Sequence, residues 1–312
     1  YLVISLISPS EVKNPTSIAI GSFDGLHAGH RKLIESVVAE NEYTPTIASF
    51  WPHPREVLYE ETRLRLDLPE EKLPILENLG IEQLVLIPFD KKLSKLSADN
   101  FVKDVLINQL QAKNISVGAN FRFGFKRSGD ISTINNLIKD MDIKLKVISI
   151  LEDKEGRVSS SRVRDLLQKG DLKSAFQILS RAYSFKGKVV KGKGIGKSLG
   201  FPTANLEIDG RKFLPGEGVY AAWTTIEKSS NKIPSVMNLG SQPTINPLLP
   251  SAVEVHLINK NINLYGLDLI VEPVERIRSQ KKFANMEQLA IQISKDEKKA
   301  SKILNNHKVR IY

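Results

Sequence analysis

The sequence predicts an α/β domain with a doubly wound parallel sheet, followed by a small antiparallel β-barrel that ends in a helix. Three observations support this fold class. The chain has 312 residues, more than one typical core needs. Apolar runs alternate with amphipathic stretches as far as Arg181, as in parallel sheets wrapped by helices. After Arg181, short β-rich runs separated by Gly, Pro, Asn and Ser predominate. We therefore expect two domains, over residues 1–182 and 183–312.

The elements of the first half are predicted from their apolar patterns. Residues 16–23 form an apolar run typical of a buried strand, and residues 29–42 place Leu33 and Val37 on one face of a helix. Ser97 is a suitable N-cap for a later helix. Further strands are expected over residues 44–50, 82–89, 115–121 and 143–150, and further helices over residues 68–80, 97–110, 130–141 and 163–181.

The second half contains four long β-rich runs and one amphipathic stretch. The amphipathic stretch, residues 286–304, has apolar residues at Leu289, Ile293 and Ile303 and predicts the terminal helix. The expected strands cover residues 219–227, 233–240, 252–259 and 267–277.

Composition excludes several classes of site. The chain has no cysteine, so disulfide frameworks, thiolate catalysis and cysteine-ligated metals are excluded, and we expect a cytoplasmic protein. We expect no membrane partner, because no apolar run approaches the roughly 18 residues of a spanning helix. The opening run lacks the basic start of a signal peptide. The net charge of +10 implies an anionic partner, and both nucleic acid and polyphosphates fit this charge.

A glycine-rich loop follows the first predicted strand and leads into a helix. Gly21, Gly25 and Gly29 permit close approach of the backbone to a ligand. The start of the helix offers unpaired N–H groups and a positive dipole end. His27 and His30 lie in its first turn and can donate hydrogen bonds to phosphate oxygens. Phosphate binding is one interpretation; zinc binding is the other, although no cysteine or evident carboxylate completes a ligand set.

A second glycine-rich loop precedes the sequence FPTAN. Gly192, Gly196 and Gly200 expose backbone between two predicted strands, which suits a cover for polyphosphate. The loop is not a Walker A motif, because no G-x-x-x-x-G-K-[ST] pattern lies between a strand and a helix. Thr203 and Asn205 lie two residues apart on an extended segment, so their side chains face the same way. Their oxygens are hard donors suited to Mg²⁺ bound with ATP.

The chain resembles the bacterial bifunctional riboflavin kinase/FMN adenylyltransferase family, also called FAD synthetase, over essentially its whole length. The first glycine-rich loop resembles the H-x-G-H signature of the adenylyltransferase superfamily, and FPTAN is a hallmark of riboflavin kinases. The segments that carry the resemblance are 50–58 (FWPHPREVL), 117–130 (VGANFRFGFKRSGD), 158–172 (VSSSRVRDLLQKGDL), 187–206, 237–245 (MNLGSQPTI), 253–259 (VEVHLIN) and 275–283 (ERIRSQKKF).

The resemblance implies two ATP-dependent reactions. The second domain would phosphorylate riboflavin to FMN, and the first would adenylylate FMN to FAD. The implied partners are ATP, riboflavin, FMN and FAD, with Mg²⁺ as cofactor and no nucleic acid.

The resemblance also implies roles for individual residues. ATP for adenylyl transfer would bind at Gly21, Phe23, Asp24, His27, His30, Ser160, Ser161 and Arg164, and flavin at Asn120, Phe121 and Arg278. ATP for the kinase would bind at Gly192, Gly196, Gly200, Thr203 and Asn205, of which Thr203 and Asn205 are also the implied metal ligands. The implied catalytic residues are His27, His30, Arg164 and Glu254, with Glu254 deprotonating the riboflavin hydroxyl.

The chain departs from the family pattern at three positions. Ser161 stands where threonine is usual, Gln280 where glutamate is frequent, and Trp51 where an acidic residue is frequent. Two other interpretations are a kinase whose first domain is inactive and an RNA-binding module that uses the basic surface.

Overall fold

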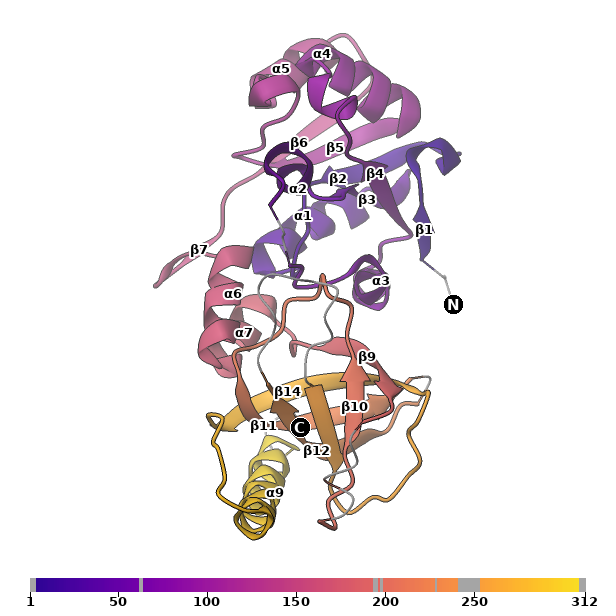
Figure 1. Ribbon diagram of the computed structural model, residues 1–312. Coiled ribbons are helices and arrows are strands. Elements are labelled where there is room, and N and C mark those ends of the chain that lie inside the picture. Colours follow the sequence, from indigo (N-terminus) through magenta and orange to yellow (C-terminus); the bar gives the residue numbers. More distant parts are fainter. Residues whose placement is uncertain are drawn as a thin grey trace. The chain divides into compact units, whose positions relative to one another are not determined.

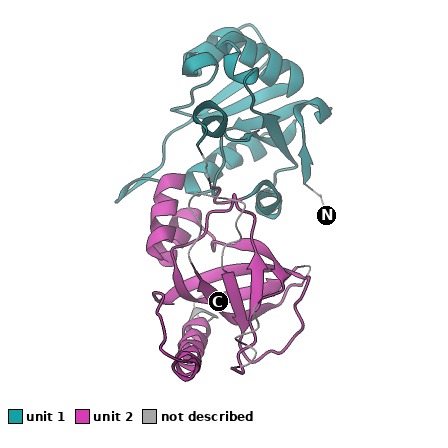
Figure 2. Ribbon diagram, in the orientation of Figure 1, with its two compact units in different colours: residues 1–63, 68–159 teal, residues 64–67, 160–312 magenta. Residues whose placement is uncertain are grey.

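The chain divides into two units in a computed structural model that describes residues 4–61, 64–192, 196, 199–227, 229–240 and 253–308. Figure 2 shows unit 1, residues 1–63 and 68–159, and unit 2, residues 64–67 and 160–312. The predicted domain boundary falls between residues 182 and 183, whereas the main segment of unit 2 already begins at residue 160. The difference arises because the helical stretch before the barrel groups with the barrel.

Unit 1 contains a six-stranded sheet in which all neighbouring strands are parallel, which confirms the predicted fold class. The strand order is β1-β4-β3-β2-β5-β6 (Figure 1). The chain passes from β2 through β3 to β4 on one side and then returns to β5 on the other side of β2. At such a switch point the loops after the two central strands diverge and leave room for a ligand. The strands are β1 (Ser5–Ile7), β2 (Thr16–Ile20), β3 (Thr44–Trp51), β4 (Gln83–Pro88), β5 (Ala112–Gly118) and β6 (Lys144–Ile148).

Helices cover both faces of this sheet. Ile18 and Ile20 of β2 pack into one apolar core, and Ala19 between them packs into the other. This alternation follows from the two-residue period of a strand. Ser97 caps α4 by accepting a hydrogen bond from the N–H of Asn100 at 3.2 Å, as predicted. The helices are α1 (Ala28–Val38), α3 (Pro69–Asn78), α4 (Ala98–Asn100), which continues as the π-helix η3 (Phe101–Gln109), and α5 (Ile131–Ile138).

The predicted helix over residues 163–181 is two helices, α6 (Ser160–Lys169) and α7 (Leu172–Leu179). Gly170 ends α6 with a φ of +76°, a left-handed conformation that favours glycine. Asp171 then caps α7 by accepting a hydrogen bond from the N–H of Ser174 at 3.0 Å. The predicted stretch is therefore helical, but it is divided where a glycine is followed directly by an N-cap residue.

Several short elements of unit 1 were not predicted. They contain few residues, so their apolar periods are too short to recognise. They are strand β1, helix α2 (Pro54–Tyr59), the hairpin of β7 (Glu152–Asp153) and β8 (Gly156–Arg157), and the 3₁₀ helices η1 (Pro9–Glu11), η2 (Leu93–Lys95) and η4 (Phe125–Arg127).

Unit 2 contains a closed barrel of six antiparallel strands, in the order β10-β13-β12-β11-β14-β9 (Figure 1). The terminal helix α9 (Met286–Lys308) packs on it, and Leu304 shares a core with Val219 and Trp223. The barrel and the terminal helix confirm the second half of the predicted fold. The strands are β9 (Phe185–Val190), β10 (Ala204–Glu207), β11 (Gly218–Ile226), β12 (Lys232–Leu239), β13 (Val253–Leu257) and β14 (Asp268–Arg278).

A four-residue segment from the first half of the sequence, Leu64–Asp67, folds as part of unit 2. The ammonium group of the fully buried Lys212 donates to the carbonyl of Leu66 at 2.6 Å. The guanidinium of Arg181 donates to both carboxylate oxygens of Asp67 at 2.6 Å. Two buried cations of unit 2 thus find their acceptors in a segment that is distant in sequence.

Within the described ranges, no helix combines the length and the apolar character that a membrane crossing requires.

Replacing Asp67 by Asn should destabilise unit 2 by about 3 kcal/mol, because it leaves a nearly buried guanidinium without its carboxylate. Urea unfolding followed by Trp223 fluorescence in a Trp51→Phe background measures this loss. The control is Glu227→Gln, which breaks the exposed pair with Lys186 and should cost less than about 1 kcal/mol. Equal losses in the two variants would contradict a special role for the buried pair.

Candidate active sites

The loop after β2 brings buried residues to the switch point of the sheet. Phe23 and Leu26 have left-handed φ angles of 43° and 44°, a conformation that is costly for residues with large side chains. Phe23 is fully buried in the core that contains α1, and the neighbouring Asp24 is also buried. A Cβ at Gly21 would lie 3.3 Å from the Phe23 ring. Gly21, Phe23 and Asp24 thus shape a tight loop directly before α1.

His27 and His30 lie at the start of α1, where His27 is the N-cap residue. Their rings stack with centroids 3.7 Å apart and an interplanar angle of 17°. The Phe23 ring lies 5.2 Å from that of His30. Both Nδ1 atoms are buried, and neither has a hydrogen-bond partner among the described residues. A buried polar atom without a partner suits a site that a ligand completes.

Burial keeps both imidazoles neutral. It lowers the pKa of His27 to about 4, and the nearby Arg157 also lowers it while Asp24 opposes the change. Burial and the neighbouring imidazole of His27 lower the pKa of His30 well below its ordinary value. A neutral imidazole still carries one N–H, so each ring retains one donor for an anion.

The zinc interpretation finds no support in the described part of the chain. No group of three or more His, Cys, Asp and Glu residues there could hold a metal ion. His27 and His30 therefore lack the third protein ligand that a zinc site normally requires.

The loop after β5 lies on the other side of the same switch point. Asn120 is exposed there, in the turn beyond the end of β5. Phe123 belongs to the core, and Phe121 packs partly buried against it with ring centroids 5.4 Å apart. Phe125 is exposed. Asn120 and Phe121 thus lie in the loop after β5 without full burial, whereas Phe123 serves the core.

The second predicted phosphate-binding motif lies at the start of α6, in unit 2. Ser160 and Ser161 are its first two residues, and their N–H groups are among those that a helix leaves unpaired. Arg164 donates to the carbonyl of Leu64 at 3.1 Å, and its guanidinium lies 5.9 Å from the centroid of the Phe213 ring. These contacts fix the orientation of Arg164 within unit 2.

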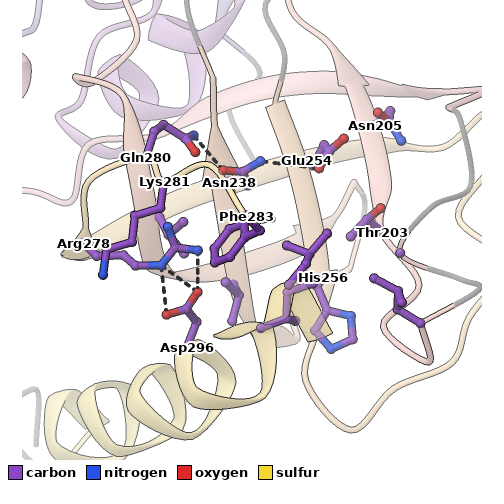
Figure 3. A pocket seen from close by; sticks show the side chains of 16 residues that line it. Thr203, Asn205, Asn238, Glu254, His256, Arg278, Gln280, Lys281, Phe283 and Asp296 are labelled. Carbon is purple, nitrogen blue, oxygen red and sulfur yellow. Dashed lines mark hydrogen bonds and ion pairs between the residues drawn. The ribbon is translucent and has the colours of Figure 1, made fainter. Parts of the chain in front are cut away.

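The barrel contains a cavity of about 300 Å³ (Figure 3). One cross-strand row supplies five of its lining residues. Asn205 of β10 is the register partner of Glu254 in β13, which is also the partner of Asn238 in β12. The row continues through Val219 of β11 to Arg278 of β14. Residues directly opposite one another in antiparallel strands face the same side of the sheet. The barrel register therefore collects side chains that are far apart in sequence.

Thr203 and Asn205 both line this cavity, in agreement with their predicted common orientation. A hydroxyl and a carboxamide oxygen are neutral hard donors, which fit Mg²⁺ when ATP phosphates supply the negative charge. The nearby carboxylate of Glu254 lies in the same cavity, with Oε2 3.4 Å from Nδ2 of Asn238. The donor set fits a divalent ion carried by a nucleotide.

Two described glycines of the second loop, Gly192 and Gly196, pack closely around these donors. A Cβ at Gly192 would collide with the Asn205 carboxamide, and one at Gly196 with the carbonyl of Phe201. Gly200 has a φ of +84°, which favours glycine. Gly194 and the end of the motif MNLGSQPTI, from Ser241 to Ile245, lie outside the described residues.

The other wall of the cavity is held by an ion pair between β14 and α9. Arg278 contacts both carboxylate oxygens of Asp296, at distances from 2.7 to 3.1 Å, and both side chains are largely buried. Phe283, Leu289 and Ile293 make the surrounding surface apolar (Figure 3). Arg278, predicted to contact flavin, thus also fastens the terminal helix to the barrel.

Several cavity residues received no role from the sequence, among them Asn238, His256 and Asp296. Asn238 lies in the motif MNLG, but only the register shows that it is next to Glu254. His256 contacts the carbonyl of Pro202 through Nδ1 at 2.8 Å, which ties β13 to the segment before Thr203. Asp296 of α9 is buried and pairs with Arg278, and nothing in the local sequence distinguishes it from the neighbouring acid Glu297.

Comparisons with known proteins agree with two catalytic domains. A family model described as FAD synthetase matches residues 10–162, and one described as riboflavin kinase matches residues 179–304.

Curated relatives match almost the whole chain. The bifunctional riboflavin kinase/FMN adenylyltransferase of Escherichia coli K12 is 33% identical over 90% of this chain and 90% of its own. That of Haemophilus influenzae is 31% identical over 98% and 99%, and that of Bacillus subtilis is 32% identical over 93% and 92%. A solved structure described as a macrolide-efflux protein from Streptococcus pneumoniae has a TM-score of 0.81 and 27% identity, and covers 95% of this chain and 98% of its own.

The stability of unit 1 should depend on pH through His27. Its pKa is about 4 in the folded protein and about 6.5 when unfolded, so the unfolded chain binds more protons between these values. The free energy of unfolding should therefore fall as the pH drops from about 6.5 to 4, by about 3 kcal/mol from this group. Urea unfolding at pH 7 and pH 5, followed by Trp51 fluorescence in a Trp223→Phe background, should show about 2 kcal/mol of this loss, because pH 5 still lies above the folded pKa.

The variant His27→Gln removes one of the two buried imidazoles and should make this pH dependence less steep, leaving the part that His30 contributes. A slope as steep as that of the parent chain would show that burial of His27 does not cause it.

Proposed function

Because the chain belongs to the bifunctional riboflavin kinase/FMN adenylyltransferase family, we propose that it makes FAD from riboflavin in two steps. The γ-phosphoryl group of one ATP passes to the 5′-hydroxyl of riboflavin, which gives FMN and ADP. The FMN phosphate then attacks the α-phosphorus of a second ATP, which gives FAD and pyrophosphate. Use of ATP in both steps supports a cytoplasmic location.

The kinase step is assigned to the barrel cavity. The observation that carries this assignment is the register pairing of Asn205 with Glu254 beside Thr203. In the proposed mechanism Glu254 accepts the proton of the riboflavin hydroxyl as that oxygen attacks phosphorus. Thr203 and Asn205 would hold Mg²⁺, which when bound neutralises charge on the transferring phosphoryl group. The apolar wall at Phe283 suits a flat aromatic ring.

The adenylyl transfer step is assigned to the switch point of unit 1. Neutral His27 and His30 can each donate one hydrogen bond to phosphate oxygens as charge develops on them. The start of α1 adds its dipole and unpaired N–H groups. No covalent intermediate on the protein is required, because both steps are direct displacements at phosphorus.

A time course with riboflavin, ATP and Mg²⁺ tests the overall proposal. FMN should appear first, and FAD should follow as FMN accumulates, with both flavins separated by chromatography. If FMN accumulates without any FAD, the chain is a kinase alone. If neither flavin forms, the proposed function is wrong.

Two variants should separate the activities. His30→Ala should lower the formation of FAD from FMN by about 100-fold or more, because a donor to the charged transition state is lost. It should leave phosphorylation of riboflavin within about twofold of the parent rate. Glu254→Gln should have the reverse pattern, with riboflavin phosphorylation lowered by about 100-fold or more. Loss of both activities in either variant would contradict two independent sites.

A further inference from the structure

Asn238 occupies a position next to the proposed base, and no role was predicted for it. It lies on β12, directly opposite Glu254 of β13 in the barrel register. Its Nδ2 is 3.4 Å from Oε2 of Glu254, and both side chains are partly buried in the wall of the cavity (Figure 3). A carboxamide can form a hydrogen bond to an ionised carboxylate only by donating from its NH₂ group. The orientation of the amide therefore decides whether Asn238 and Glu254 attract or repel each other.

The orientation of Asn238 is fixed by Gln280, which follows β14. Nε2 of Gln280 donates to the backbone carbonyl of Leu239 at 2.8 Å, and a backbone carbonyl can only accept. This contact identifies the end of the Gln280 side chain that carries the N–H groups. The same Nε2 lies 2.8 Å from Oδ1 of Asn238, which must therefore be the accepting end. The N–H end of Asn238 is then the one that faces Glu254.

We propose that Asn238 is a positioning residue for Glu254 in riboflavin phosphorylation, with its amide oriented by Gln280 and the carbonyl of Leu239. The inference rests on the proposed kinase function of the barrel. By donating to Oε2, Asn238 holds one oxygen of the carboxylate and leaves Oε1 for the substrate hydroxyl. Proton transfer requires the base to be held at hydrogen-bond distance, and small displacements reduce the rate strongly. Asn238 itself does not exchange a proton with the substrate.

The test is the kinetics of riboflavin phosphorylation by Asn238→Ala. We expect kcat to fall by about 10-fold or more while KM for riboflavin and for ATP changes by less than about twofold, because the contact orients the base rather than the substrate. Gln280→Met, which keeps the length of the side chain and removes its donors, should lower kcat by a smaller factor. The control Asn231→Ala removes an exposed asparagine just before β12 and should leave both constants unchanged.

A double-mutant cycle distinguishes positioning from a general structural effect. In a Glu254→Gln background, measured by transfer of labelled phosphate from ATP, adding Asn238→Ala should cause no further loss of rate. Formation of FAD from FMN by the same variants reports that the chain is folded and should be unchanged.

Three outcomes would overturn the inference. An Asn238→Ala effect of equal size with and without Glu254 would show that Asn238 does not act through the carboxylate, as would a change confined to KM. In both cases the proposed kinase function would stand. If the parent chain does not phosphorylate riboflavin at all, the proposed function fails and the inference fails with it.

Discussion

The strand register of the closed barrel is the constraint on which the second site depends. Each strand pairs on both sides, so no strand can slip by one residue without turning its buried face outward. Asn205, Glu254 and Asn238 are collected into one row by this register and not by proximity in sequence. The same pairing that buries Val253 and Val255 presents the residue between them to the cavity. The alternation of side chains along β13 thus both buries the two valines and directs Glu254 to the cavity.

The two proposed sites would bind polyphosphate in different physical ways. In unit 1, burial lowers the pKa of the two stacked histidines, so both imidazoles are neutral. They therefore offer N–H groups and not a positive charge. Such donors require no rearrangement as negative charge develops. In unit 2, the cavity presents a hydroxyl, a carboxamide and a carboxylate, which favour a cation bound between protein and phosphate. A protein that handles two molecules of ATP can therefore keep the two sites chemically distinct.

Local patterns predicted most of the fold, because each pattern has a local physical cause. Ser97 caps its helix through a neighbour three residues away, and Thr203 and Asn205 share a cavity because a strand alternates every residue. The break at Gly170 was missed although its signal is local, since apolar residues continue on both sides of it. Asn238 could not be assigned in this way. Its importance depends on which strands are neighbours in a closed barrel, and no local pattern encodes that choice.

The segment Leu64–Asp67 shows why compact units and catalytic domains need not share boundaries. Burying the ammonium of Lys212 and the guanidinium of Arg181 is costly unless acceptors are supplied, and this segment supplies them for unit 2. Unit 2 therefore has acceptors for these two cations only when residues 64–67, from the first half of the sequence, are folded into it. The same holds in reverse for Ser160 and Ser161, which belong to a motif of the adenylyltransferase type but begin a helix of unit 2. Folding of the barrel unit is consequently linked to the first half of the sequence through the covalent path of the chain.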